Sequence, residues 1–245
     1  MRLLCKVSYK GTNYQGWQKQ KDAPTVEETI EKVLSQILNE EIYIFGSGRT
    51  DAGVHAQCQY FHFDLHKDFD IDRLRYSANS LLPKDIFILE MKPVSDDFHA
   101  RYSAKSKTYS YLIRFGERNA FNYEYECNIP GEIDINLLIE SLKQFEGTHN
   151  FQDFTSKEED EAGFVRTIYS VDVQNYPLAK QLLVIFKGNG FMRYQIRDMV
   201  GTAIAVAMKK EYKNFIKDHL KDKKEREIVS YKAPPEGLFL VDVNY

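Results

Sequence analysis

The chain has 245 residues, of which 43% are hydrophobic and 28% charged, and its formal net charge is −3. This length and composition exclude a disordered or fibrous chain, and they are enough for a buried core. The negative net charge excludes a uniformly basic surface, so a nucleic acid would have to be held by one face only. Three widely spaced cysteines, Cys5, Cys58 and Cys127, suggest neither a disulfide framework nor a zinc site. With no signal peptide and no apolar run near the ~20 residues that span a bilayer, we expect a cytoplasmic protein.

The first half of the chain alternates predicted strands with predicted helices. Residues Arg2 to Tyr9 are expected to form a strand, and a turn region rich in glycine and asparagine follows over Lys10 to Ala23. Thr25 and Glu28 have the spacing of a capping box, which predicts a helix with an apolar face up to residue 38. The next predicted elements are a strand at Ile42–Phe45, a strand at His55–Phe63, a helix at Asp70–Leu82 and a strand at Ile86–Met91.

The second half of the chain also contains both predicted strands and predicted helices. Its predicted elements are strands at Lys105–Phe115, Phe164–Val173 and Gln181–Lys187, and helices at Ile135–Phe145 and Ile196–Ala207. The basic run from Lys209 to Arg226 predicts a solvated helix, and contact with an RNA backbone is the alternative. The order of elements is typical of an α+β protein whose antiparallel sheets are covered by helices, with a boundary near residues 100–105.

One segment carries the strongest chemical signal. Residues Gly46 to His55 read Gly-Ser-Gly-Arg-Thr-Asp-Ala-Gly-Val-His, which places Asp51 in a glycine-flanked turn two residues after Arg49. Glycine permits a tight turn and the close approach of a ligand. The neighbouring guanidinium favours the ionised carboxylate, and an ionised aspartate can act as a nucleophile. The alternative is that Asp51 only caps its own turn.

This segment resembles the catalytic motif of the TruA family of tRNA pseudouridine synthases, whose pattern reads Gly-Arg-Thr-Asp-x-Gly-Val-His. The turn region from Tyr9 to Gln20 resembles the RNA-facing Tyr-x-Gly-x-x-Tyr-x-Gly-Trp-Gln-x-Gln segment of the same family. Its tyrosines, amides and Trp17 suit stacking on nucleotides, and packing of Trp17 in the core is the alternative. With the motifs that follow, the resemblance covers essentially the whole chain.

Three residues farther along match positions that the family uses for its substrate. Tyr109 stands where the family has its substrate-contacting tyrosine, although a packed aromatic residue is the alternative. Arg197 matches the arginine of the active-site cleft, and a solvated polar face shared with Arg193 is the alternative. Leu238 matches the apolar residue that lines the uracil pocket. Residues 192–194, Met-Arg-Tyr, depart from the apolar and histidine residues usual in the family.

The resemblance implies a complete functional hypothesis. The expected fold is α+β with two similar halves, 1–102 and 103–245, each a mainly antiparallel sheet covered by helices, with a catalytic cleft between them. The expected activity is isomerisation of uridine to pseudouridine at positions 38, 39 or 40 of the tRNA anticodon stem-loop by a homodimer, with base flipping and without metal or cofactor. The implied site consists of Asp51 as nucleophile and of Arg49, Tyr109, Arg197 and Leu238 as substrate-binding residues.

Two other functions are weighed against this one. A non-catalytic RNA-binding protein of the same fold would use the same aromatic and basic surface. A hydrolase acting on the glycosidic bond would release uracil instead of rejoining it. Such an enzyme commonly needs a second carboxylate as general acid, and no motif supplies one beside Asp51.

Overall fold

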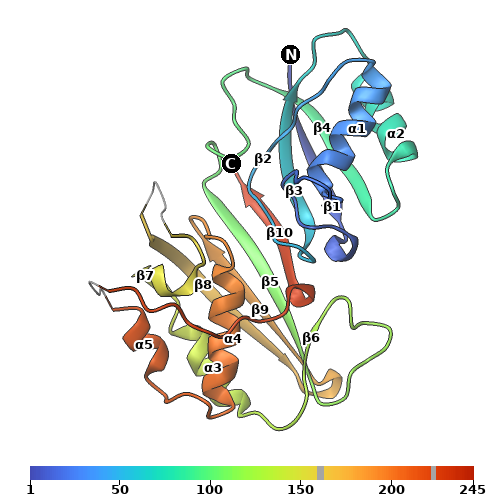
Figure 1. Ribbon diagram of the computed structural model, residues 1–245. Coiled ribbons are helices and arrows are strands. Elements are labelled where there is room, and N and C mark those ends of the chain that lie inside the picture. Colours follow the sequence, from blue (N-terminus) through green and yellow to red (C-terminus); the bar gives the residue numbers. More distant parts are fainter. Residues whose placement is uncertain (159–162, 222–224) are drawn as a thin grey trace. The chain divides into compact units, whose positions relative to one another are not determined.

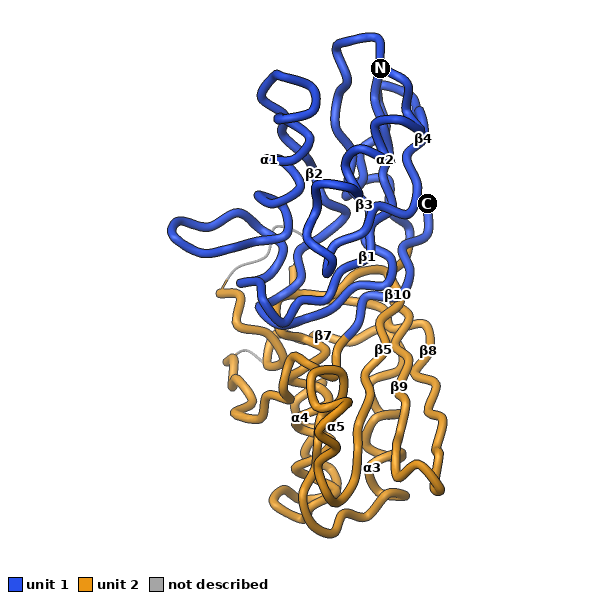
Figure 2. Tube along the Cα trace, turned by 90° about the vertical axis from the view of Figure 1, so that its right-hand side faces the viewer, with its two compact units in different colours: residues 1–105, 239–245 blue, residues 106–238 orange. Residues whose placement is uncertain are grey.

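The chain forms two compact units, each built from a mainly antiparallel sheet and helices (Figures 1 and 2). The computed structural model describes residues 1–158, 163–221 and 225–245. The first unit contains residues 1–105 and 239–245, and the second contains residues 106–238. The α+β class predicted from the sequence is confirmed.

The sheet of the first unit is organised around its N-terminal strand. Strand β1 (Arg2–Tyr9) pairs antiparallel with β3 (His55–Asp64) on one side and with β4 (Ile86–Val94) on the other. The short β2 (Phe45–Gly46) pairs antiparallel with β3 at Phe61 and His62. The C-terminal strand β10 (Leu238–Asn244) returns to this unit and pairs parallel with the start of β3.

The helices of the first unit begin where the sequence predicts. Helix α1 (Val26–Leu38) follows Thr25, whose Oγ1 accepts a hydrogen bond from the backbone N–H of Glu28. Helix α2 (Ile71–Leu81) follows Asp70, whose carboxylate accepts one from the backbone N–H three residues later. Each side chain satisfies a donor that the first turn leaves without a partner. The two helices lie side by side in Figure 1.

The strand predicted at Ile42–Phe45 is mostly wrong, because only Phe45 and Gly46 form a strand. Side chains of α1 take up the backbone donors of the preceding residues. Ser35 Oγ accepts from the N–H of Ile42 at 2.9 Å, and Glu31 Oε1 accepts from the N–H of Ile44 at 3.1 Å. Both isoleucines are buried, so the alternation in the sequence reflects burial against the helix and not membership of a sheet.

In the described residues of the second unit, strands pair antiparallel in the order β5, β9, β8, β7. These are β5 (Ser106–Phe115), β9 (Gln181–Gly188), β8 (Val165–Tyr176) and β7 (Gly147–Asn150), and β6 (Cys127–Ile129) pairs parallel with β5. Helices α3 (Ile135–Lys143) and α4 (Gln195–Ala207) pack against each other, as Figure 1 shows. In the described part of the chain, no helix is both long and apolar enough to span a membrane.

The basic run from Lys209 to Arg226 is not a solvated helix. Its helical part is the short α5 (Phe215–His219), in which Ile216 and His219 are buried. His219 Nδ1 lies 2.8 Å from a carboxylate oxygen of the buried Asp153. At the end of the run, Arg226 Nε donates to the carbonyl of Gln152 at 2.7 Å. These contacts anchor the run to the core of the second unit, and residues 222–224 lie outside the described residues.

The buried His62 on β3 leads to a prediction about how the stability of the fold depends on pH. Its Nδ1 accepts the backbone N–H of Ala100 at 3.2 Å, and its ring lies 4.6 Å from that of His99. Burial, with the charges of His99 and Arg2, lowers the pKa of His62 to about 4. As the pH falls, the His62 imidazole of the unfolded chain is therefore protonated near pH 6.5, before that of the folded protein. Stability from this site is full above that pH and is lost as the pH falls toward 4, by up to about 1.4 kcal/mol per pH unit.

Denaturant unfolding from about pH 7 to about pH 4 checks this prediction. The free-energy difference between the wild type and His62→Gln is expected to shrink as the pH falls. His66→Gln, at an exposed histidine just beyond β3, is the matched control and should keep the wild-type pH profile. Parallel profiles for His62→Gln and the wild type would contradict the assignment.

Candidate active site

Asp51 lies in the loop that connects β2 to β3 in the first unit. The backbone N–H of Val54 donates to the carbonyl of Asp51 at 3.1 Å and closes a turn, in which Gly53 has a φ of 77°. A positive φ favours glycine, which explains the residue at this position. Asp51 is partly exposed and Arg49 is exposed. The loop thus presents an acid and a guanidinium at the surface of the first unit.

Strand β3 holds the loop on one side through Gln59. The Nε2 of this fully buried side chain donates to the carbonyl of Gly48 at 3.0 Å. Its Oε1 accepts from the hydroxyl of Ser47, and the backbone N–H of Ser47 donates to the carbonyl of Tyr60 at 2.7 Å. One amide side chain therefore fixes the two residues before Arg49.

The segment after β1 holds the same loop on the other side. The hydroxyls of Tyr9 and Thr50 are hydrogen-bonded at 2.8 Å, and the backbone N–H of Trp17 donates to the carbonyl of Thr50 at 3.1 Å. The N–H of Gly53 donates to the carbonyl of Tyr14 at 3.3 Å. Asp51 is therefore flanked on both sides by residues bonded to the segment.

This segment was expected to face RNA with its aromatic side chains, and the structure corrects that expectation. Tyr9, Tyr14 and Trp17 are all buried, and Trp17 packs against Tyr9 and Phe61. The alternative of a core tryptophan is the correct one. The aromatic residues support the loop, and the exposed residues left for RNA are polar, among them Asn13 and Gln15.

Two glycines allow the segment and the loop to touch through their backbones. A Cβ at Gly11 would lie 2.0 Å from the carbonyl oxygen of Val54, and one at Gly16 would lie 2.5 Å from that of Thr50. Gly16 also has a φ of 89°. Side chains are excluded at both positions, so the glycines of the segment serve its contact with the Asp51 loop.

Replacing Gln59 with leucine is expected to lower the free energy of unfolding by roughly 2–4 kcal/mol, because buried polar groups around Ser47 and Gly48 lose their partner. Chemical denaturation measures the change. Gln57→Leu, at an exposed position of the same strand, is the matched control and should shift stability by less than about 0.5 kcal/mol. Equal effects of the two substitutions would contradict the role given to Gln59.

Tyr109 is a buried residue of β5 in the second unit. It is 8% exposed, and its ring meets that of Phe191 edge-on at 5.3 Å. Two residues along the strand, the hydroxyl of Tyr111 donates to the carbonyl of Pro234 at 2.7 Å. The surroundings of Tyr109 are those of a packed aromatic residue, and its contact with a substrate stays a prediction.

Arg197 lies in the first turn of α4 and joins this helix to the segment before β10. Its Nε donates to the carbonyl of Ala233 at 2.8 Å, while the N–H of Ala233 donates to the carbonyl of Arg197 at 2.9 Å. The side chain is partly exposed. Arg197 is therefore held in position, and a merely solvated polar face does not describe it.

Leu238 begins β10 and is 5% exposed. It follows Gly237, where a Cβ would lie 2.8 Å from the carbonyl oxygen of Leu112 and 2.9 Å from the ring of Tyr111. The close approach places residues 234–238 against β5. Asp51 and Arg49 thus share one loop of the first unit, whereas Arg197 and Leu238 are connected through residues 233–238 of the second.

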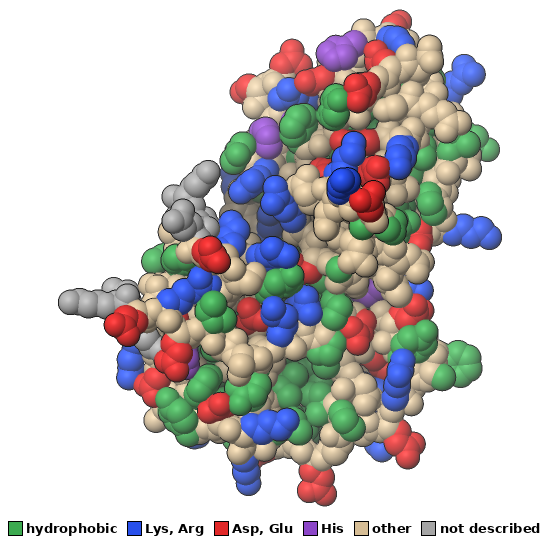
Figure 3. Space-filling model, viewed as in Figure 1, with side chains coloured by type: hydrophobic (Ala, Val, Ile, Leu, Met, Phe, Trp, Pro, Cys, Tyr) green, Lys and Arg blue, Asp and Glu red, His purple; other side chains and the backbone are tan. Residues whose placement is uncertain are grey.

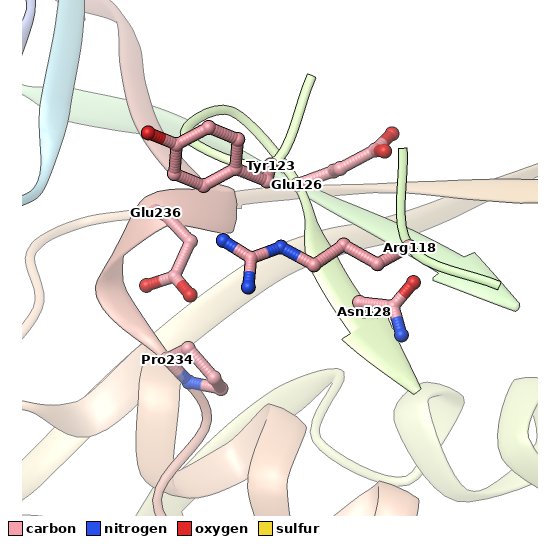
Figure 4. A pocket seen from close by; sticks show the side chains of 6 residues that line it. All are labelled: Arg118, Tyr123, Glu126, Asn128, Pro234 and Glu236. Carbon is pink, nitrogen blue, oxygen red and sulfur yellow. The ribbon is translucent and has the colours of Figure 1, made fainter. Parts of the chain in front are cut away.

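Sequence reasoning missed a pocket of about 180 Å³ in the second unit (Figure 4). Arg118 lies with its Cζ 4.4 Å from the ring centroid of Tyr123, and its guanidinium points toward Glu236 in Figure 4. A second acid in the lining, Glu126, accepts a hydrogen bond from Gln181. The lining carries one cation, Arg118, and two acids, Glu126 and Glu236, so the pocket does not favour an anion. Its lining is Arg118, Tyr123, Glu126, Asn128, Pro234 and Glu236.

Comparison with known proteins decides the family. Residues 6–103 and 142–245 match the family described as tRNA pseudouridine synthase. The chain belongs to this family. Asp51, Arg49, Arg197 and Leu238 fall within the matched residues of this pseudouridine synthase, and Tyr109 lies between the two matched parts.

Curated relatives of the synthase are similar over its whole length. The tRNA pseudouridine synthase A of Streptococcus gordonii is 39% identical over 100% of this chain and 98% of its own. The tRNA pseudouridine synthase A 1 of Protochlamydia amoebophila is 38% identical over 98% of this chain and 94% of its own. The synthase is accordingly an isomerase, and the family predicted from the sequence is confirmed.

Solved structures are more distant. A chain in the crystal structure of a Cbf5-Nop10-Gar1 complex is 12% identical, with a TM-score of 0.41. The match covers 97% of this synthase and 57% of that chain.

Proposed function

We propose that the enzyme converts uridine to pseudouridine at positions 38, 39 or 40 of the tRNA anticodon stem-loop, with Asp51 as the nucleophile. The observation that supports this most is the Asp51 loop itself. Hydrogen bonds from β3 and from the segment after β1 hold it on both sides, yet Asp51 and Arg49 reach the surface. A rigid support with an exposed acid is what a positioned nucleophile requires.

The proposed reaction starts with extrusion of the target base from its stem, at an unstacking cost of a few kcal/mol. Arg49, the exposed cation of the loop, fills the vacated space and orients Asp51. Asp51 then attacks the ribose C1′ or the base C6, or assists formation of a glycal. The bond between N1 and C1′ breaks, uracil rotates, and a bond between C5 and C1′ forms. C5 loses its proton and N1 gains one, so the reaction requires no redox or phosphoryl cofactor.

The remaining substrate contacts are assigned from the family resemblance. Tyr109 stacks on or hydrogen-bonds the flipped uracil, Leu238 supplies an apolar wall, and Arg197 pairs with Asp51. The burial of Leu238 supports its part in this proposal, because a rigid apolar wall excludes water from the base. The same resemblance supports a homodimer that acts on tRNA in the cytoplasm.

An unmodified tRNA transcript labelled with tritium at C5 of its uridines tests the proposal. Release of tritium with formation of pseudouridine nucleoside is the expected result. Free uracil would instead indicate glycosidic hydrolysis. Binding of the transcript without either product would indicate the non-catalytic RNA-binding alternative. The control transcript carries cytidine at positions 38, 39 and 40 and should release no tritium.

A further inference from the structure

Three cationic side chains surround one tyrosine ring at the start of α4. Lys232 Nζ lies 3.8 Å from the ring centroid of Tyr194, Arg193 Cζ lies 4.8 Å from it, and Arg197 Cζ lies 5.3 Å from it. We call these four residues the Tyr194 cluster. Arg193 and Lys232 are exposed, and Tyr194 and Arg197 are partly exposed. Figure 3 shows Lys and Arg side chains gathered in the middle of the face that it draws.

The backbone holds this cluster in place. Tyr194 has a φ of 65°, a left-handed conformation that a residue other than glycine adopts at a cost in free energy. Its hydroxyl accepts from Arg193 Nη2 at 2.9 Å. Lys232 comes from a different segment, which packs on α4 at Gly201, where a Cβ would lie 2.8 Å from the nitrogen of Ala233. The cations are therefore brought together by the fold and not by sequence proximity alone.

The electrostatics of the cluster are unbalanced toward positive charge. The like charges of Arg193 and Lys232 repel one another, and the ring face offsets only about 0.5–1 kcal/mol for each of these exposed cations. Among the described residues, neither Arg193 nor Lys232 forms a salt bridge with a carboxylate. The acid in the first turn of α4, Asp198, is buried. The positive end of the helix dipole adds to the field, so the cluster is complementary to an anion.

We propose that the Tyr194 cluster binds a backbone phosphate of the substrate RNA. A guanidinium fork beside an ammonium group suits phosphate oxygens. Because the site is exposed, a single free phosphate would be held weakly, whereas a phosphate of an RNA already held elsewhere is present at high effective concentration. The inference rests on the proposed function, since it takes tRNA as the ligand.

The test measures tRNA affinity between about 50 and 200 mM salt for the wild type, Arg193→Ala, Lys232→Ala and the double variant. Each single substitution is expected to weaken binding about 3–10-fold, because one charge on the phosphate is lost. The slope of log Kd against log salt should fall by about 0.7–0.9 in the double variant. Lys232→Arg should retain the slope. Lys32→Ala, whose exposed lysine on α1 pairs with Glu28 at 2.9 Å, is the control and should bind as the wild type does.

Both substituted side chains are exposed, so unfolding free energies should stay within about 0.5 kcal/mol of the wild type. The inference is overturned if the double variant keeps the wild-type salt slope. The outcome for the proposed function is separate. A wild type that binds tRNA without forming pseudouridine, but loses salt slope in the double variant, refutes the activity and supports the phosphate site.

Discussion

Replacing Asp51 with asparagine is expected to slow pseudouridine formation by at least about 10³-fold, because the amide is almost the same size as the carboxylate but is neither charged nor nucleophilic. Hydrogen bonds through Gln59, Thr50 and the backbone hold the loop, and these bonds stay in place in the variant. Tritium release from labelled tRNA at saturating enzyme measures the chemical step, and a binding assay on the same variant measures tRNA affinity. The decrease should appear in the rate of the chemical step.

Asp72→Asn provides the matched control. Asp72 lies on α2 with a side chain that is 92% exposed, and it forms a 3.7 Å ion pair with Arg75. Its substitution changes the net charge by the same amount and should leave tritium release at the wild-type rate. A rate for Asp51→Asn within about tenfold of that control would remove Asp51 from the role of nucleophile.

Replacing Gly16 with alanine is expected to have the largest effect on stability, about 3 kcal/mol or more. Two causes combine at this position, a φ of 89° and a Cβ placed 2.5 Å from the carbonyl oxygen of Thr50. Because the neighbouring atom belongs to the backbone, the Asp51 loop has to move. A displacement of about 1 Å lowers the rate roughly 10²-fold, even at a temperature where the variant stays folded.

Gly116→Ala separates the two causes. Gly116 has a φ of 80° but nothing within 4 Å of the added Cβ, so its substitution carries the backbone strain without the contact. We expect a loss of about 1 kcal/mol in unfolding free energy and wild-type activity. Denaturant unfolding and tritium release on both variants measure the difference. If Gly16→Ala lowered the unfolding free energy and the rate no more than Gly116→Ala, this would contradict the role of the contact between the segment and the loop.

The sequence correctly predicted elements whose ends depend on residues nearby in the chain, such as helix-capping side chains. The capping residues Thr25 and Asp70 start their helices as expected, and β1 has the predicted bounds. The failures arise where a tertiary contact overrides the local pattern. The donors of Ile42 and Ile44 are taken by side chains of α1, and the basic run after Lys209 is tied to the core through His219.

The same division applies to the candidate site. The Asp51 motif is contiguous, so its position in a turn could be predicted from its glycines, whereas its role as nucleophile was implied by the family resemblance and stays a proposal. Its support by Gln59 and the burial of Trp17 depend on how β1 and β3 pair, which no local pattern encodes. The Tyr194 cluster needs Lys232 to come from a segment more than thirty residues away, so it too became visible only in the folded chain.

The most direct test of the central claim is a map of pseudouridine in an unmodified tRNA transcript treated with the wild-type enzyme. Chemical labelling of pseudouridine followed by sequencing locates each modified position. The predicted result is pseudouridine confined to positions 38, 39 and 40 of the anticodon stem-loop, and none after treatment with Asp51→Asn. Pseudouridine at other positions, or equal modification by the two proteins, would contradict the account.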